Sequence, residues 1–198
     1  MCGIVGYTGA RPALGIVLDG LRRLEYRGYD SAGVAVQSRG RLLTEKRAGK
    51  LANLEKALAE LDVPDIGEGT TGIGHTRWAT HGGPTDRNAH PHTSMDGRIA
   101  VIHNGIIENF AKLRAELEAG GVEFASDTDT ECVAHLLAAQ LPAAGSLAAA
   151  MRRVCTRLAG AFTLLAIDAA EPDVVVGARR NSPLVVGRGS NGFYLASD

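Results

Sequence analysis

Apolar strands stand near both ends of this chain, and a block of helices lies between them. In the first half, strand-like patterns occupy residues 2–7, 33–46, 71–76 and 98–103, and helical patterns occupy residues 14–24 and 51–61. Helical spacing of apolar residues then dominates from 110 to 158, and four more strand patterns follow between 161 and 196. This order predicts an α+β domain in which two helix layers enclose sheets, rather than an alternating parallel fold.

Bulk composition excludes several classes of protein. The net charge is −1 over 198 residues, which favours neither a nucleic acid nor an anionic membrane as partner. No stretch reaches the ~18 apolar residues of a membrane span, and the basic-then-apolar order of a signal peptide is missing. Three cysteines without CxxC spacing argue against a disulfide framework. We therefore expect one large domain or two small ones in the reducing cytoplasm.

Cys2 opens the first apolar strand and is a candidate nucleophile. Removal of Met1 would leave a thiol and a free α-amine on one residue. An α-amine has an ordinary pKa of about 7.7–8.0, so it can act as a base near neutral pH. The alternative is a small buried thiol at the start of a strand.

Residues 77–96 form a dense polar run without periodicity, and segments of this kind inside compact domains are usually functional or disordered. Asn104-Gly105 follows a strong strand and alone would indicate a hairpin turn, although a helical pattern comes next. Histidines 75, 81, 90 and 92 suggest a metal site, but structural zinc sites usually combine four ligands at tight spacing. We expect no metal and no cofactor. Cys132 and Cys155 lie in helical patterns beside apolar residues, where we expect inert core thiols.

Six motifs in one order resemble a known family. They are residues 2–6 (CGIVG), 26–33 (YRGYDSAG), 75–82 (HTRWATHG), 88–92 (NAHPH), 103–109 (HNGIIEN) and 126–131 (SDTDTE). Together they resemble the glutaminase domain of the isomerising glutamine–fructose-6-phosphate amidotransferases, a family of class II glutamine amidotransferases. The resemblance implies an N-terminal-nucleophile hydrolase fold, a four-layer α/β/β/α sandwich with antiparallel sheets.

The resemblance also assigns roles to residues of this chain. Cys2 would attack the γ-amide of L-glutamine to give a γ-glutamyl thioester, and Asn104 with Gly105 would form the oxyanion hole. Arg77 would hold the α-carboxylate with its planar fork, and Asp129 would hold the α-ammonium. For these two residues the alternatives are a surface charge and a helix N-cap, and Asp129 could do both jobs. The remaining implied residues are Trp78, Thr80 and His81 in a loop that folds over glutamine, and Arg27 and Gly28 as support for the Cys2 terminus.

Members of this family use the released ammonia to convert fructose 6-phosphate to glucosamine 6-phosphate, a precursor of hexosamines and cell walls, and the full-length enzyme is expected to be a homodimer. Their two sugar isomerase domains, which bind fructose 6-phosphate, have no counterpart in this chain. We expect residues 1–198 to be a glutaminase domain truncated at its C-terminal end, with strand 192–196 left as an open edge. Two alternatives stay open: an amidotransferase with another acceptor, and a catalytically silent binding fragment.

Overall fold

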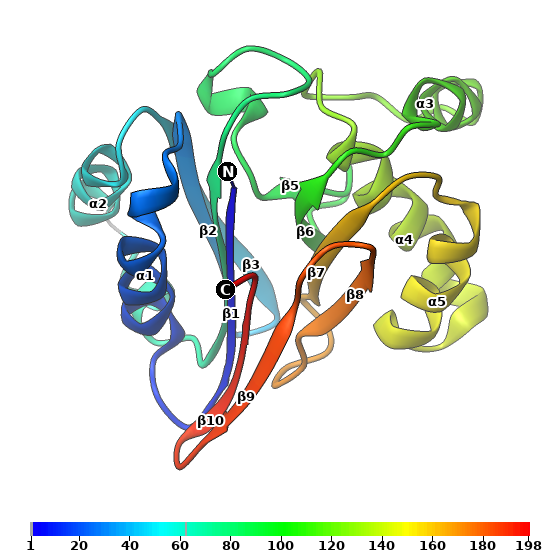
Figure 1. The fold of residues 1–198 in the computed structure, drawn as a ribbon. Coiled ribbons are helices and arrows are strands. Elements are labelled where there is room, and N and C mark those ends of the chain that lie inside the picture. The colour runs from blue at the N-terminus through cyan, green and yellow to red at the C-terminus, as the bar shows by residue number, and fades with distance from the viewer. Residues whose placement is uncertain (1, 62) are drawn as a thin grey trace.

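Two antiparallel sheets stack face to face and carry helices on their outer faces (Figure 1). The computed structural model describes residues 2–61 and 63–198, and Met1, whose removal we predict, lies outside them. Within this part of the chain the layers run helix, sheet, sheet, helix. The predicted four-layer sandwich with antiparallel sheets is therefore confirmed.

The first sheet has six strands in the order β3-β2-β4-β1-β10-β9. Their bounds are β1 (Gly3–Gly9), β2 (Ser31–Ser38), β3 (Arg41–Ala48), β4 (Thr71–Arg77), β9 (Val185–Gly189) and β10 (Gly192–Ala196). β1 lies inside this sheet, between β4 and β10. Cys2, immediately before β1, is therefore carried by an interior strand rather than by a free arm.

The second sheet has four strands in the order β5-β6-β7-β8. Their bounds are β5 (His92–Thr93), β6 (Ile99–Gly105), β7 (Phe162–Asp168) and β8 (Val176–Arg180). The Asn104-Gly105 pair ends β6, and both residues pair across to β7. A loop and a helix follow Gly105, so the hairpin interpretation of this pair is wrong.

Helices cover the outer face of each sheet. α1 (Ala13–Arg23) and α2 (Leu51–Glu60) pack on the six-stranded sheet. α4 (Thr130–Ala144) and α5 (Leu147–Arg157) pack on the other, and α3 (Phe110–Ala119) packs against α4. α5 begins where the sequence predicts, because the Ser146 hydroxyl accepts a hydrogen bond from Ala149 N at 3.2 Å.

Apolar side chains fill all three gaps between layers. One cluster, with Val17 and Val34, lies beneath α1 and α2, and another, with Leu137, lies beneath α4 and α5. The third joins Ile4 to Ile102 between the two sheets. Burial of each such side chain stabilises the fold by about 1.5–3 kcal/mol. The three clusters therefore hold the four layers together and keep the strand ends in fixed relative positions.

The edge of the six-stranded sheet differs from the prediction. β10 is hydrogen-bonded on both sides, to β1 and to β9, so residues 192–196 are not an open edge. β9 is the edge strand, and all of its residues are exposed. Among the described residues no helix is long and apolar enough to cross a membrane.

Candidate active site

Cys2 is anchored where β4 ends beside the start of β1. Trp78 N–H donates a hydrogen bond to the Cys2 sulfur at 3.2 Å, and the thiol lies 3.7 Å from the Trp78 carbonyl oxygen. Gly3 N–H donates to the Thr76 hydroxyl at 3.1 Å, which fixes the adjoining backbone. Burial raises the pKa of the Cys2 thiol, so the resting sulfur is protonated near neutral pH and needs a base before it attacks.

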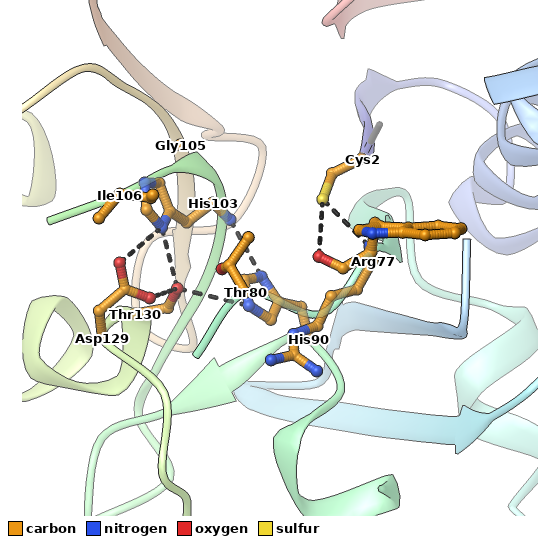
Figure 2. Close-up of a pocket in the computed structure, with 10 residues that line it drawn as sticks. Cys2, Arg77, Thr80, His90, His103, Gly105, Ile106, Asp129 and Thr130 are labelled. Atoms are coloured by element: carbon orange, nitrogen blue, oxygen red, sulfur yellow. Dashed lines mark hydrogen bonds and ion pairs between the residues drawn. The ribbon is translucent and has the colours of Figure 1, made fainter. Parts of the chain in front are cut away.

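Cys2 lines a cavity of about 250 Å³ between β4, β6 and the start of α4 (Figure 2). The residues that line it are Cys2, Arg77, Trp78, Thr80, His90, His103, Gly105, Ile106, Asp129 and Thr130. This set contains five of the predicted substrate and catalytic residues besides Cys2. Five separate segments of the chain thus meet around one small space.

Asn104 contacts the backbone of Cys2, and Gly105 lines the same cavity as Cys2, although Asn104 itself is not among the lining residues. The Asn104 Nδ2 donates to the Cys2 carbonyl oxygen at 3.1 Å. Gly105 has φ of +120°, and a Cβ at this position would lie 2.2 Å from the Ala161 carbonyl oxygen. Only glycine fits this backbone and this contact, and it leaves the amide beside the cavity unshielded.

Arg77 is buried in the cavity wall and already makes bonds within the protein. Its guanidinium donates to the carbonyl oxygens of His81, Gly82 (3.0 Å) and Gly83 (3.4 Å). Arg77 therefore ties residues 81–83 to the end of β4, and no described contact takes its Nε–H. The surface-charge alternative is wrong, because Arg77 is only 3% exposed.

Asp129 lies on another side of the same cavity (Figure 2). Its Oδ2 accepts a hydrogen bond from Ile107 N at 2.8 Å and lies 3.8 Å from His103 Nδ1. Asp129 occupies the N-cap position of α4, but its side chain makes no capping bond and is buried. The predicted N-cap position is therefore confirmed but the capping bond is not, because the carboxylate is directed to the loop before α3 and to the cavity.

The predicted loop residues divide into two groups. Trp78 and Thr80 are exposed and line the cavity. His81 is not among the lining residues, and its ring packs against Phe110 at 4.7 Å between centroids. Gly28 lies against the Trp78 indole, where a Cβ would be 3.6 Å from the ring. Arg27 lies 3.6 Å from the Asp198 carboxylate, so the 27–28 turn joins Trp78 to the end of β10.

Sequence reasoning missed His90, His103 and Thr130, which also line the cavity. All three residues lie inside the motifs that carry the resemblance, which could have marked them as site residues, but the motifs alone assign them no role. His75, His90 and His92 form a buried ring cluster, with centroids 4.2 Å and 4.8 Å apart. Burial lowers the pKa of each, that of His75 to about 3, so they are neutral.

In the parts of the chain that the structure describes, no group of three or more His, Cys, Asp or Glu could hold a metal ion. Cys132 is buried and Cys155 half-buried, and burial raises the pKa of both thiols, that of Cys132 to about 12. Neither lines the cavity.

An antiparallel four-layer sandwich with a cysteine at the head of an interior strand defines the class of N-terminal-nucleophile hydrolases. Comparison with known proteins narrows this class. Residues 75–198 match the family model described as the glutamine amidotransferase domain, and the chain belongs to this family.

Individual relatives agree with the family assignment. The chain is 67% identical over 198 residues to glutamine–fructose-6-phosphate aminotransferase [isomerizing] of Streptomyces coelicolor, and 60% identical over 205 residues to that of Mycolicibacterium smegmatis. Both alignments cover 100% of this chain but only 32% of the relative, so the chain spans about a third of their length. Among solved structures it resembles glutamine phosphoribosylpyrophosphate amidotransferase from B. subtilis, with TM-score 0.81 and 27% identity over 99% of this chain and 42% of that one.

Proposed function

We propose that this chain hydrolyses L-glutamine to glutamate and ammonia through a thioester on Cys2. The observation that carries the proposal is that Cys2, Arg77 and Asp129 line one small cavity. A nucleophilic sulfur, a cation and an anion match the γ-amide, α-carboxylate and α-ammonium of glutamine. Four relatives with 59–67% identity support the same chemistry, since each is named as a glutamine–fructose-6-phosphate aminotransferase.

The reaction begins with attack of the Cys2 sulfur on the γ-carbonyl carbon. The α-amine of Cys2, freed by loss of Met1, takes the thiol proton, which a thiol with a raised pKa does not release by itself. The carbonyl oxygen becomes negative and accepts hydrogen bonds from Asn104 Nδ2 and Gly105 N–H. The C–N bond then breaks, the ammonium form of the amine protonates the departing ammonia, and a thioester remains. Water attacks the thioester and releases glutamate and the Cys2 thiol.

The use of the ammonia follows from the longer relatives. In a polypeptide of their length, ammonia from this domain would convert fructose 6-phosphate to glucosamine 6-phosphate at the sugar isomerase domains, in a homodimer. The alternative acceptor, phosphoribosylpyrophosphate, is less well supported, because identity to that structure is 27% against 67% for the first relative. Three free cysteines fit the reducing cytoplasm.

Intact mass and a glutaminase assay test the proposal together. We expect loss of one methionine, release of ammonia from glutamine, and one-to-one labelling of the protein by a glutamine-like electrophile. Cys2→Ala should abolish hydrolysis and labelling while the domain stays folded. Cys155→Ala, a matched loss of a half-buried thiol, should leave turnover nearly unchanged. Retained Met1 with no labelling and no ammonia would instead favour the silent fragment.

A further inference from the structure

The carboxamide of Asn104 has only one orientation that satisfies both of its neighbours. Its contact with the Cys2 carbonyl oxygen at 3.1 Å requires a donor, so the nitrogen faces Cys2. The oxygen then faces His75 Nε2 at 2.9 Å and requires a donor in return. His75 must therefore carry its proton on Nε2.

The surroundings of His75 hold the ring in place. It lies on β4, opposite Ile4 of β1 and Gly33 of β2, and is fully buried between the sheets. The His90 ring stacks on it at 4.2 Å with an interplanar angle of 18°. A Cβ on Gly33 would lie 2.1 Å from the His90 carbonyl oxygen, so the backbone at residue 90 rests directly on that glycine.

Lys46 fixes the segment that carries His90. Its ammonium donates to the carbonyl oxygens of Arg87 (3.2 Å), Ala89 (2.9 Å) and Pro91 (3.1 Å). Three bonds from one charged group to a single short segment leave it little freedom. The wall behind His75 is thus rigid, and the His75 ring has one well-defined position.

We propose that His75 is a positioning residue that turns the Asn104 amide nitrogen toward the oxyanion of the reaction, a role that rests on the proposed function. Neither His75 nor Asn104 is among the residues that line the cavity, but Asn104 Nδ2 contacts the Cys2 carbonyl oxygen, so His75 acts through Asn104 and not on substrate. Because the ring is neutral, it presents one donor, Nε2–H, to the Asn104 oxygen. Without that donor only the Cys2 carbonyl oxygen restrains the carboxamide, which can then rotate and present its oxygen to the developing negative charge.

Replacement of His75 by residues with and without an Nε2-like donor tests this role. His75→Leu should lower kcat on the order of tenfold to a hundredfold, up to the effect of losing one oxyanion donor, with KM nearly unchanged. His75→Gln, whose amide N–H can replace Nε2–H, should recover most of that loss. His92→Leu is the matched control, because His92 belongs to the same ring cluster but bonds Thr128 rather than Asn104.

A second readout isolates the oxyanion from general damage to the site. An aldehyde analogue of glutamine adds the Cys2 sulfur to its carbonyl carbon, and the carbonyl oxygen becomes an oxyanion in the same place. Its affinity should fall by the same factor as kcat/KM in His75→Leu, whereas the affinity for glutamate should not change. A raised KM with unchanged kcat, or undiminished aldehyde affinity, would overturn the proposal.

A measurement on the unaltered chain remains decisive even where a variant does not fold. The ¹⁵N shifts of His75 report its tautomer, and we expect a proton on Nε2 only, from about pH 5 to 8. A proton on Nδ1 would overturn the proposal. If the unaltered chain shows this tautomer but releases no ammonia, the proposed function fails while the arrangement of His75 and Asn104 stands.

Discussion

Cys2 and Trp78 are joined in both directions by hydrogen bonds, although 76 positions separate them in the chain. The Trp78 N–H donates to the sulfur at 3.2 Å, and the thiol faces the Trp78 carbonyl oxygen at 3.7 Å. The residue next to Trp78, Arg77, lines the same cavity. The end of β4 therefore positions the proposed nucleophile and the proposed carboxylate ligand together.

The alkylation of Cys2 should show its raised pKa. Burial raises the pKa of this thiol, so its reactive thiolate forms at higher pH than an ordinary thiolate. In a Cys155→Ala background, we expect the rate constant with iodoacetamide to keep rising above about pH 8.5, where an ordinary thiol is half ionised. Peptide mapping after mass labelling would assign the reaction to Cys2. A profile that reaches its plateau below that pH would contradict the prediction.

The proposed binding of glutamine by Arg77 and Asp129 can be tested by comparing two substrates. Arg77→Lys removes the planar fork and also the bonds to residues 81–83, and a bond to a charged group contributes about 1.5–3 kcal/mol. We expect kcat/KM for glutamine to fall by about one to two powers of ten. Asp129→Asn should act similarly through the α-ammonium.

The ratio between substrates distinguishes binding from loop support. If Arg77 holds the α-carboxylate, Arg77→Lys should lose far less activity toward an analogue that lacks this group. Equal losses toward glutamine and the decarboxylated analogue would show that Arg77 serves only to hold the 81–83 loop.

The sequence predicts the site's members better than their contacts. The apolar run after Cys2 predicts a buried strand, and β1 follows it closely. The resemblance places Asn104 and Gly105 near Cys2, and Asn104 Nδ2 contacts the Cys2 carbonyl oxygen. These predictions succeed because they depend on local patterns and on residues named by the resemblance.

Contacts that depend on how the two sheets pack or on the path of a loop could not be predicted in this way. The bond from His75 to Asn104 joins two different sheets, and the packing between those sheets determines it. The bonds of Arg77 to loop carbonyls depend on the path of a segment without periodicity. The open edge predicted for residues 192–196 assumes a missing neighbour, but β9 pairs with β10 on that side.

Gly105→Ala should disable catalysis by moving the oxyanion donor. A methyl group there meets the Ala161 carbonyl oxygen at 2.2 Å, so the ends of β6 and β7 must separate. We expect kcat to fall by about 10²-fold or more. Gly121→Ala is the matched control, because Gly121 also has a positive φ, +89°, but its Cβ would meet no atom within 4 Å. That variant should lose stability by about 1–2 kcal/mol but keep its kcat. Equal losses of kcat in both would contradict the assignment.

Glu131 should make the domain sensitive to acid. Burial raises the pKa of its carboxyl, but hydrogen bonds from His135, Ser126 and Ala125 outweigh burial and hold the pKa at about 2. The unfolded chain binds this proton near pH 4.3, so the stabilisation is complete above that pH and is lost as pH falls toward 2. The slope should be about 1.4 kcal/mol per pH unit within this window.

Glu131→Gln tests that contribution. The amide can no longer accept from both Ala125 N and Ser126 N, each at 2.7 Å, so stability at pH 7 should fall by about 2–4 kcal/mol. Urea unfolding at pH 7, 4.5 and 3 should also show a shallower dependence on pH. Glu118→Gln, at a side chain that is 50% exposed, should change neither quantity. An unaltered slope in Glu131→Gln would assign the acid sensitivity to other groups.

The edge strand β9 should exchange its amide hydrogens faster than either β10 or β6. β9 is paired on one side only and all its residues are exposed, whereas β10 and β6 are paired on both sides.

Val185 and Val186 of β9 are 56% and 65% exposed, which makes this edge a template for pairing with a second chain. We therefore expect the apparent mass in sedimentation to grow with concentration, and Val186→Lys to restore a monomer. Exchange of β9 as slow as that of β6 in a monomeric sample would mean that the edge is covered.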